Sequence, residues 1–328
     1  MATRAEDKDE LHEPVLLAEI IDWLRPERSG TFVDCTVGTG GHSRAILSAS
    51  PETTVIGLDR DLEALDMARG RLAIFEDRIR LIHTNFDDIA SVLNQIGISE
   101  VDGVLADLGV SSLQLERGER GFSFASDAPL DMRMDQSRGP TAADLVNQLS
   151  QRELADLILE YGEERGARRI ARRVARERDR EPVKTTRQLA DIVVRALNLR
   201  GRWRIHPATR TFQALRIAVN DELSALARFI PDAISVLAGG RRLAIVSFHS
   251  LEDRIVKRSF LRESGRCTCE APKGKERREE STDEIICERC GARRRINILT
   301  RRPVRPGLEE IKRNPRSRSA LLRVCERL

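Results

Sequence analysis

The sequence predicts an α/β fold: a mostly parallel, doubly wound sheet interrupted by an all-helical insertion. Three observations predict it. Strand-like and helical segments alternate over positions 1–110, positions 141 to about 200 are helical in pattern throughout, and a strand-like run resumes at 241–248. Alternation with this period is typical of a parallel sheet that carries helices on both faces.

The first elements follow from apolar spacing. In "PVLLAEIIDWL" at 14–24, apolar residues recur at helical intervals, and Pro14 suits the first turn of a helix. Runs rich in β-branched residues then predict four strands, at 31–37, 53–58, 79–83 and 101–106. Between the first three strands the spacing predicts helices near 43–49 and 61–73.

The pattern changes after Asp107. Glycines and prolines predict loops over 111–140, and later segments predict helices at 141–149, 150–162, 166–178, 185–197, 208–229 and 232–238. Further strands are expected at 241–248, 294–299 and 319–324. We therefore expect a discontinuous sheet domain (1–135 and 215–328), a helical insertion domain (136–214), and a cysteine-bearing loop insertion (264–292).

Composition indicates a soluble globular protein, since 40% of the 328 residues are hydrophobic and 33% are charged. No apolar run approaches the roughly 20 residues that span a bilayer. The first dozen residues are charged and lack the apolar core of a secretory signal. These features predict a cytoplasmic protein without a membrane partner.

Charge is divided unevenly along the chain. Residues 1–110 hold 10 basic and 21 acidic side chains, a balance of −11, so the net charge of +4 leaves +15 for the remainder. Residues 289–327 alone hold 13 basic side chains against three acidic ones. Such a run is sometimes only a solvated surface, but its self-repulsion favours a polyanionic partner, which predicts a nucleic acid.

The stretch "TFVDCTVGTGGHS" at 31–43 predicts a nucleotide-binding turn. Gly38, Gly40 and Gly41 follow a strand and precede a helix, where glycine lets the backbone approach a ligand closely. Asp59 ends the next strand along the chain. A carboxylate in that place can accept hydrogen bonds from ribose hydroxyls. The alternative for Asp59 is a helix N-cap.

The turn favours an adenosyl donor over a dinucleotide. Ser43 occupies the position where the dinucleotide pattern has its third glycine, and the lysine of a phosphate-binding P-loop is absent. Asp34 provides an anion for the ammonium group of adenosylmethionine. Phe86 can stack on a purine, with Asp87 or Asp88 accepting from its amino group, although a core position is the alternative for Phe86.

Several longer motifs carry a family resemblance. They are "HEPVLL" at 12–17, "GTGGHS" at 38–43, "ADLGVSSLQL" at 106–115, "RGFSF" and "PLDMRMD" near 120–135, "FQALRIAVNDEL" at 212–223, "SFHSLEDRIVK" at 247–257 and "NPRSRSALLR" at 314–323. With them the chain resembles the bacterial small-subunit ribosomal RNA cytosine-N4 methyltransferases. The blocks extend over nearly the whole chain, omitting chiefly the N-terminal tail and residues 264–292.

The resemblance implies a Rossmann-like class I methyltransferase. It implies S-adenosylmethionine as methyl donor, and a cytosine of the 16S ribosomal RNA decoding centre, in the small ribosomal subunit, as acceptor. Carried over by motif, the expected cofactor contacts are Gly40, Gly41, His42, Asp59, Phe86, Asp107 and Gln114.

Asp107 is also the expected catalytic residue. The N4 lone pair of cytosine is delocalised, and an acceptor beside the amino group would localise it and take a proton. Amine methyltransferases often place prolines and an aromatic residue after the fourth strand, but here the chain has Asp107-Leu108-Gly109-Val110. His249 and Ser250 are expected on the acceptor side, with a structural histidine as the alternative. The target base would be swung out of folded RNA while arginines of the helical insertion domain, the expected RNA-recognition domain, and of the basic C-terminal segment bind phosphates.

Four of the six cysteines lie close together, between positions 267 and 290. Cys267/Cys269 and Cys287/Cys290 form two pairs, and the second, with Gly291 after it, resembles a zinc knuckle. The first pair is one residue short of the usual spacing, so reduced cysteines on a loose loop are the alternative. A structural zinc would stiffen this hairpin and present arginines 293–295 to RNA.

Two other functions compete with methyl transfer. A nicotinamide-dependent oxidoreductase would use the same fold, although Ser43 and the basic insert disfavour it. A non-catalytic, RNA-binding ribosome assembly factor would keep the fold without the chemistry. The sequence makes no prediction of oligomeric state.

Overall fold

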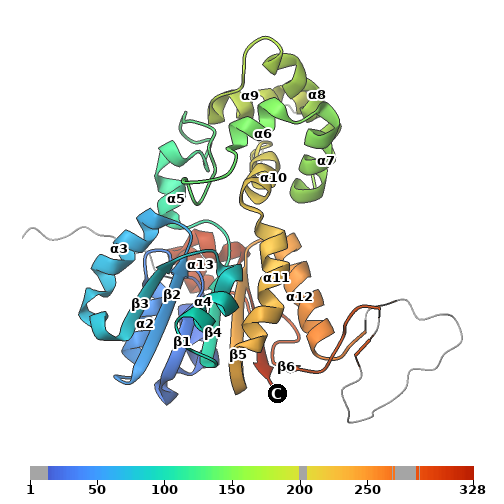
Figure 1. Ribbon diagram of the computed structural model, residues 1–328. Helices are drawn as coiled ribbons and strands as arrows, with labels where there is room; N and C mark the ends of the chain where they lie inside the picture. The colour runs from blue at the N-terminus through green and yellow to red at the C-terminus, as the bar shows by residue number, and fades with distance from the viewer. Residues whose placement is uncertain (1–13, 199–204, 268, 270–285, 288) are drawn as a thin grey trace, which may run out of the picture.

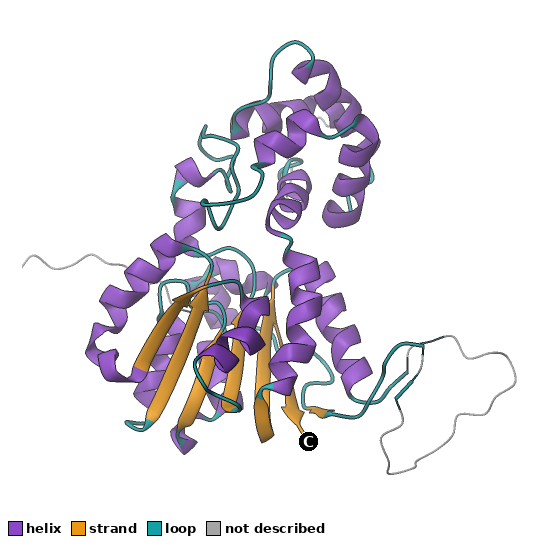
Figure 2. Ribbon diagram, in the orientation of Figure 1, coloured by secondary structure: helices purple, strands orange, loops and turns teal. Residues whose placement is uncertain are grey.

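A single seven-stranded sheet organises the lower part of the molecule (Figures 1 and 2). The computed structural model describes residues 14–198, 205–267, 269, 286–287 and 289–328. The strand order is β3-β2-β1-β4-β5-β7-β6. The strands are β1 (Gly30–Asp34), β2 (Thr53–Asp59), β3 (Ile79–His83), β4 (Val101–Asp107), β5 (Leu237–Ser247), β6 (Ile296–Ile298) and β7 (Leu321–Arg327).

The sheet is mostly parallel, as predicted. Strands β1 to β5 pair in parallel, and β7 runs antiparallel between β5 and β6. The chain thus has a Rossmann-like fold. Because the strand order reverses between β1 and β4, the connections that leave the carboxyl ends of these two paired strands run in opposite directions and leave a crevice, the usual ligand position in open α/β sheets.

Two apolar layers cover the sheet. Buried side chains of α1 (Leu17–Leu24), α2 (Gly41–Ala49) and α3 (Leu62–Leu72) form one cluster. Those of α4 (Ile89–Gln95), α11 (Glu222–Ser235) and α12 (Ser250–Glu263) form the other. The predicted doubly wound arrangement is confirmed.

A separate apolar cluster holds the helical part together. The helices of this part lie at the top of Figure 1. It runs from Phe122 to Leu215, within the connection between β4 and β5. Its helices are α6 (Ala142–Gln148), α7 (Gln151–Gly162), α8 (Ala167–Arg178), α9 (Thr186–Leu197) and α10 (Thr209–Asn220). The division into domains at 136 and 214 stays a prediction.

Several element predictions need correction. Helices α4, α5 (Ser112–Glu116), α12 and α13 (Leu308–Arg313) were not expected. The predicted helix 208–229 is two helices, because Asp221 adopts a left-handed φ of 49° between α10 and α11. Helix α11 continues through Pro231, since its buried apolar face outweighs one lost backbone hydrogen bond. Strand β1 ends at Asp34, not at 37.

Short 3₁₀ turns complete the described chain. They are η1 (Pro26–Arg28), η2 (Ala73–Arg78), η3 (Phe86–Asp88), η4 (Gly118–Arg120) and η5 (Pro315–Ser319). No helix in the described ranges is both long and apolar enough to cross a membrane. The predicted N-terminal tail and most of the 264–292 insertion lie outside the described residues.

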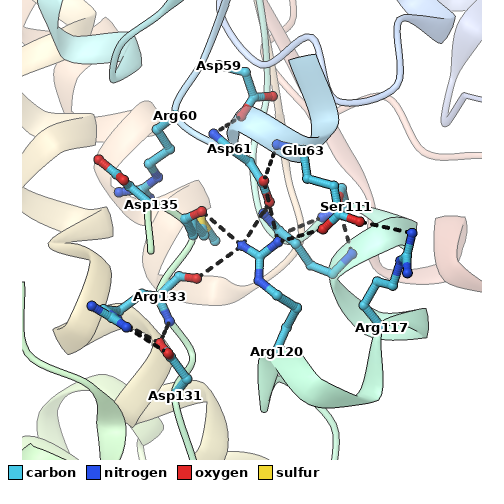
Figure 3. Close-up of polar contacts among 12 residues, drawn as sticks. Asp59, Arg60, Asp61, Glu63, Ser111, Arg117, Arg120, Asp131, Arg133 and Asp135 are labelled. Carbon is cyan, nitrogen blue, oxygen red and sulfur yellow. Dashed lines mark hydrogen bonds and ion pairs between the residues drawn. The ribbon is translucent and has the colours of Figure 1, made fainter. Parts of the chain in front are cut away.

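One buried arginine joins the sheet to the segment that leads into the helices (Figure 3). Arg120 donates to Asp61 Oδ2 (3.0 Å) and to the carbonyls of Arg133 (3.2 Å) and Met134 (2.9 Å). The side chains of Arg120 and Asp61 are only 4% and 3% exposed. Gly121 follows with φ of +75°, and a Cβ there would lie 2.4 Å from the Pro129 carbonyl oxygen. The turn is thereby fixed by one ion pair and one glycine.

Replacing Arg120 with methionine should lower the free energy of unfolding by about 3–5 kcal/mol, because it leaves the buried Asp61 carboxylate without its cation. Chemical denaturation measures this. Arg117→Met is the control: Arg117 is 51% exposed and pairs with Glu63, so about 1 kcal/mol or less is expected. Equal losses in the two variants would refute a special role for the buried pair.

Candidate active site

A pocket opens at the carboxyl ends of β1, β2 and β4. Each of these three strands ends in an aspartate: Asp34, Asp59 and Asp107. The pocket is lined by residues 14–15, 35–39, 41–42, 59–60, 85–86, 107–111, 114, 134, 222, 226, 248, 252 and 316. Six of the seven predicted cofactor contacts therefore share one cavity.

Gly40 is the predicted contact that does not line the pocket. It is the N-cap of α2, with φ of 88°, and its missing Cβ would lie 3.0 Å from Leu72 Cδ1. Gly41 does line the pocket, and a Cβ there would lie 2.5 Å from the Pro14 ring. Both glycines allow close packing around the start of α2. The structure gives Gly40 a role in packing the turn against Leu72, and no contact with the pocket.

Asp34 is placed differently from the expectation. It is fully buried and is not among the pocket-lining residues. Its carboxylate accepts from Ser43 Oγ (2.7 Å) and from the Thr36 N–H (3.2 Å). Burial raises its pKa to about 6, with these hydrogen bonds acting in the opposite direction. Asp34 therefore links β1 to α2 through its hydrogen bond with Ser43. Ser43 stands where a dinucleotide-binding turn has glycine.

Asp59 lines the pocket and accepts a hydrogen bond from the glycine turn. Its Oδ2 accepts from the Gly38 N–H (2.7 Å) and its Oδ1 from the Asp61 N–H (2.9 Å). Burial is the main cause that raises its pKa to about 6. The helix N-cap is Asp61, whose side chain accepts from the Glu63 N–H. The alternative of an N-cap at Asp59 is thus excluded, and its carboxylate retains lone pairs toward the cavity.

Phe86 lies between the pocket and the apolar core, so its stacking on a purine stays a prediction. It lines the pocket, is 8% exposed, and meets Phe229 edge to face with centroids 5.2 Å apart. Asp87 pairs with Arg228 (2.7 Å) and Asp88 accepts from Thr84. Neither acid lines the pocket, so the expected purine acceptor at 87 or 88 has another partner in each case.

Asp107 is the acid with an unused oxygen. Its Oδ1 is buried and has no hydrogen-bond partner among the described residues, while Oδ2 lies 3.7 Å from His42 Nδ1. His42 Nε2 lies 3.0 Å from the Val15 carbonyl oxygen, which fixes the ring. Burial is the largest cause that raises the pKa of Asp107 to about 6; nearby Asp34 and Glu252 raise it further and His42 lowers it.

Gln114 lines the pocket with its amide already engaged. Its Oε1 accepts from the Ser111 N–H (3.0 Å), and its Nε2 donates to Asp61 Oδ2 (2.8 Å). The side chain is 4% exposed. Its contact with a cofactor stays a prediction. Its hydrogen bonds stabilise the start of α5 and hold the Asp61 carboxylate in place.

The opposite wall contains residues that sequence reasoning missed. Glu222 and Glu252 line the pocket, whereas the expected His249 and Ser250 do not. His249 Nε2 lies 3.2 Å from Glu252 Oε1, and Ser250 Oγ donates to Glu163. The spacing of His249 and Glu252 is that of a capping box at the start of α12, which could have signalled this.

The aromatic residue absent after β4 is supplied from β5. Phe248 lines the pocket directly after that strand, and a Cβ on Gly109 would lie 3.3 Å from its ring. Gly109 has φ of +103°, a conformation that favours glycine. Sequence order hid this contact because the two residues are far apart along the chain.

The pocket suits a small, cationic, partly aromatic ligand. It offers the carboxylates of Asp59 and Asp107 and the ring of Phe86 beside the close-packed backbone of residues 36–39 and 41. An adenosyl sulfonium with its ammonium group has the complementary features. The buried, unpartnered Asp107 Oδ1 is the observation that most favours a ligand with a hydrogen-bond donor.

Comparison with known proteins identifies the family. The sequence profile of the MraW methylase family matches residues 9–328. The chain belongs to the MraW methylase family. It is therefore a methyltransferase, as the resemblance implied, and its mostly parallel Rossmann-like sheet is the class I methyltransferase fold.

Individual relatives agree with the family. A Geobacter sulfurreducens protein named ribosomal RNA small subunit methyltransferase H is 52% identical over 97% of this chain and 99% of its own. A Symbiobacterium thermophilum protein of the same name is 50% identical over 97% and 96%. Among solved structures, an rRNA methylase from Streptococcus thermophilus aligns with 10% identity over 97% of this chain and 98% of its own. The TM-score of this alignment is 0.42.

The predicted metal ligands lie apart from this pocket. The sulfur atoms of Cys267, Cys269, Cys287 and Cys290 are within 4.8 Å of one another. None of the four lines the pocket.

Asp107→Asn should stabilise the methylase near pH 8 and change little near pH 4. The folded pKa of about 6 exceeds the ordinary value of 3.8, so the folded state binds more protons between these values and wild-type stability falls as pH rises through that window. The variant lacks the part of this fall that Asp107 causes. Urea denaturation at the two pH values should show a gain of about 1–2 kcal/mol at pH 8 only. A variant less stable than wild type at pH 8 would contradict the assignment.

Proposed function

We propose that this protein transfers the methyl group of S-adenosylmethionine to the N4 amino group of a cytosine in the decoding centre of 16S ribosomal RNA, acting on the small ribosomal subunit in the cytoplasm. The relatives that carry the name ribosomal RNA small subunit methyltransferase H, identical at about half of all positions over nearly full length, are the main support. The acid-lined pocket at the switch point of the sheet agrees with it.

The donor would occupy the side of the pocket beneath the β1–α2 turn. Asp59 would accept from the ribose hydroxyls, the backbone around Gly41 would approach the donor closely, and Phe86 would stack on the adenine. When bound, the donor supplies a methyl group on a good leaving group, so positioning is the main demand on the protein. The Gly38 and Asp61 N–H groups hold Asp59 in place for this.

The acceptor base would lie between Asp107 and Phe248. Asp107 Oδ1 is free to accept a hydrogen bond from an amino group, and its pKa of about 6 leaves it mostly ionised at neutral pH. Hydrogen bonding to this oxygen localises the nitrogen lone pair and gives the departing proton a destination. The Phe248 ring offers the flat apolar surface that a base requires.

The helical part would grip RNA through α8. Its buried face consists of Ala167, Ile170, Ala171 and Val174. The opposite face carries four exposed arginines, Arg168, Arg169, Arg172 and Arg176, and within the described chain none of them forms an ion pair. At 3.6 residues per turn their directions fall within about 100°.

This arrangement costs stability unless an anion is present, because like charges one helical turn apart repel. Arg168, Arg172 and Arg176 follow one another about 6 Å apart along the axis, given a rise of about 1.5 Å per residue. A row of guanidinium groups with that spacing suits consecutive phosphates of one RNA strand. Arg316, from the basic C-terminal segment, lines the pocket and would meet the RNA near the target base.

Transfer of labelled methyl groups to isolated small subunits tests the function. Nuclease digestion of the product should yield N4-methylcytidine from a single site, and a nicotinamide cofactor should show no binding by calorimetry. Donor binding without any transfer to subunits or to their RNA would favour the assembly-factor alternative. Label on another base, or on another atom of cytosine, would refute the assigned acceptor.

Asp59→Ala should weaken binding of S-adenosylmethionine at least about tenfold, since a lost charged hydrogen bond costs about 1.4 kcal/mol or more. Calorimetry on the purified variant measures it. Asp66→Ala is the matched control, because Asp66 is a 70% exposed acid on the neighbouring helix. Unchanged affinity in Asp59→Ala would mean that the ribose lies elsewhere.

Replacing Arg168, Arg172 and Arg176 with glutamine should reduce the slope of log binding constant against log salt by about 2, for three contacts to single-stranded phosphates. Donor affinity should not change. The control triple variant replaces Arg69, Arg138 and Arg152, which are exposed and paired with acids, and so makes the same charge change. Equal effects of the two triple variants would show only a general effect of charge.

A further inference from the structure

The cysteine cluster formed by Cys267, Cys269, Cys287 and Cys290 is built like a metal site. All four sulfur atoms lie within 4.8 Å of one another, with Cys267 Sγ 3.4 Å from Cys287 Sγ and 3.6 Å from Cys290 Sγ. A disulfide requires about 2.05 Å, and none of the four forms one. Sulfurs around one tetrahedral zinc, at about 2.3 Å each, are roughly 3.8 Å apart. The observed separations match the second arrangement.

Apolar packing does not explain the cluster. The other two cysteines, Cys35 and Cys325, are buried in the core at 1% and 0% exposure. Cys267 is exposed, and the remaining three are only half-buried. Four thiols that converge near the surface gain little from burial, so another attraction must hold them together.

The backbone around the sulfurs has the form of a ligand turn. The N–H groups of Arg289 and Cys290 donate to the Cys287 sulfur, and the Cys269 N–H donates to the Cys267 sulfur (3.4 Å). Such bonds stabilise thiolates. The Gly291 N–H donates to the Cys287 carbonyl (2.7 Å), and its φ of +67° lets the chain turn directly after Cys290.

The second half of the cluster is fastened to the end of α12. The Arg293 N–H donates to the Arg262 carbonyl, and the Arg295 N–H donates to the Glu263 carbonyl. The buried Glu263 side chain also pairs with Arg295 (2.7 Å) and, at 4.0 Å, with Arg293. Two of the three arginines expected to face RNA therefore have a carboxylate partner on α12, and their contact with RNA stays a prediction.

We infer that the cysteine cluster binds one zinc ion in a closed, four-sulfur structural site. Four protein ligands leave no open position, so the ion has no catalytic role. Its effect is to join the two ends of the 267–290 segment to each other and, through residues 293–295, to α12. Thiolate ligands favour zinc over magnesium or calcium, which prefer oxygen.

Elemental analysis of protein purified under reducing conditions without chelator tests the site. We expect about one zinc ion per chain, and tetrahedral thiolate bands in the visible spectrum after exchange for cobalt. The double variant Cys287→Ser/Cys290→Ser should lose both signals. Cys325→Ala, which removes a thiol outside the cluster, should keep them.

Three outcomes would overturn the inference: no metal together with no cobalt bands, iron in place of zinc, or full metal content in the double variant. Because the double variant could disturb folding, wild-type protein treated with chelator provides a second measurement. It should lose its metal, and proteolysis between Cys269 and Cys287 should become faster. Metal content is independent of methyl transfer, so failure of the proposed function leaves this test intact.

Discussion

The ion pair between Asp61 and Arg120 is the contact on which the arrangement of the pocket depends. A buried carboxylate that loses its cation is costly, so the two segments that carry these residues must stay together. The Asp61 N–H donates to Asp59, and Arg120 donates to the carbonyls of Arg133 and Met134. Met134 lines the pocket. Two walls of the pocket that are distant in sequence are thus set by one interaction (Figure 3).

Three neighbouring strands end in aspartates, Asp34 buried and Asp59 and Asp107 half-buried, and loss of contact with water is the main cause that raises the pKa of each to about 6. The protein bears the cost of keeping these groups near one another and away from water. Asp34 and Asp59 accept hydrogen bonds that fix the turn between β1 and α2. Asp107 has one oxygen without a partner among the described residues. The proposed donor is a cation, and its binding would offset part of the cost.

The unequal distribution of charge agrees with the two proposed partners. The acidic segment 1–110 supplies most of the pocket at the sheet, where a cationic donor would bind. The basic remainder supplies α8 and the C-terminal segment, which would face the polyanion. The apolar cluster of residues 122–215 gives the helical part a core of its own, so its arginine-rich face is carried on a firm support.

Local spacing and contiguous motifs are enough to predict the sheet, the glycine turn, the acid at the end of β2 and the family. They also place the four cysteines in two close pairs. The packing of distant segments is needed to see that Ser43 keeps Asp34 out of the pocket, that Gly40 lies against Leu72, and that Phe248 and two glutamates complete the pocket. These roles depend on which strand ends are neighbours and on which polar atoms are already paired. Contacts between residues that are distant along the chain leave no local pattern.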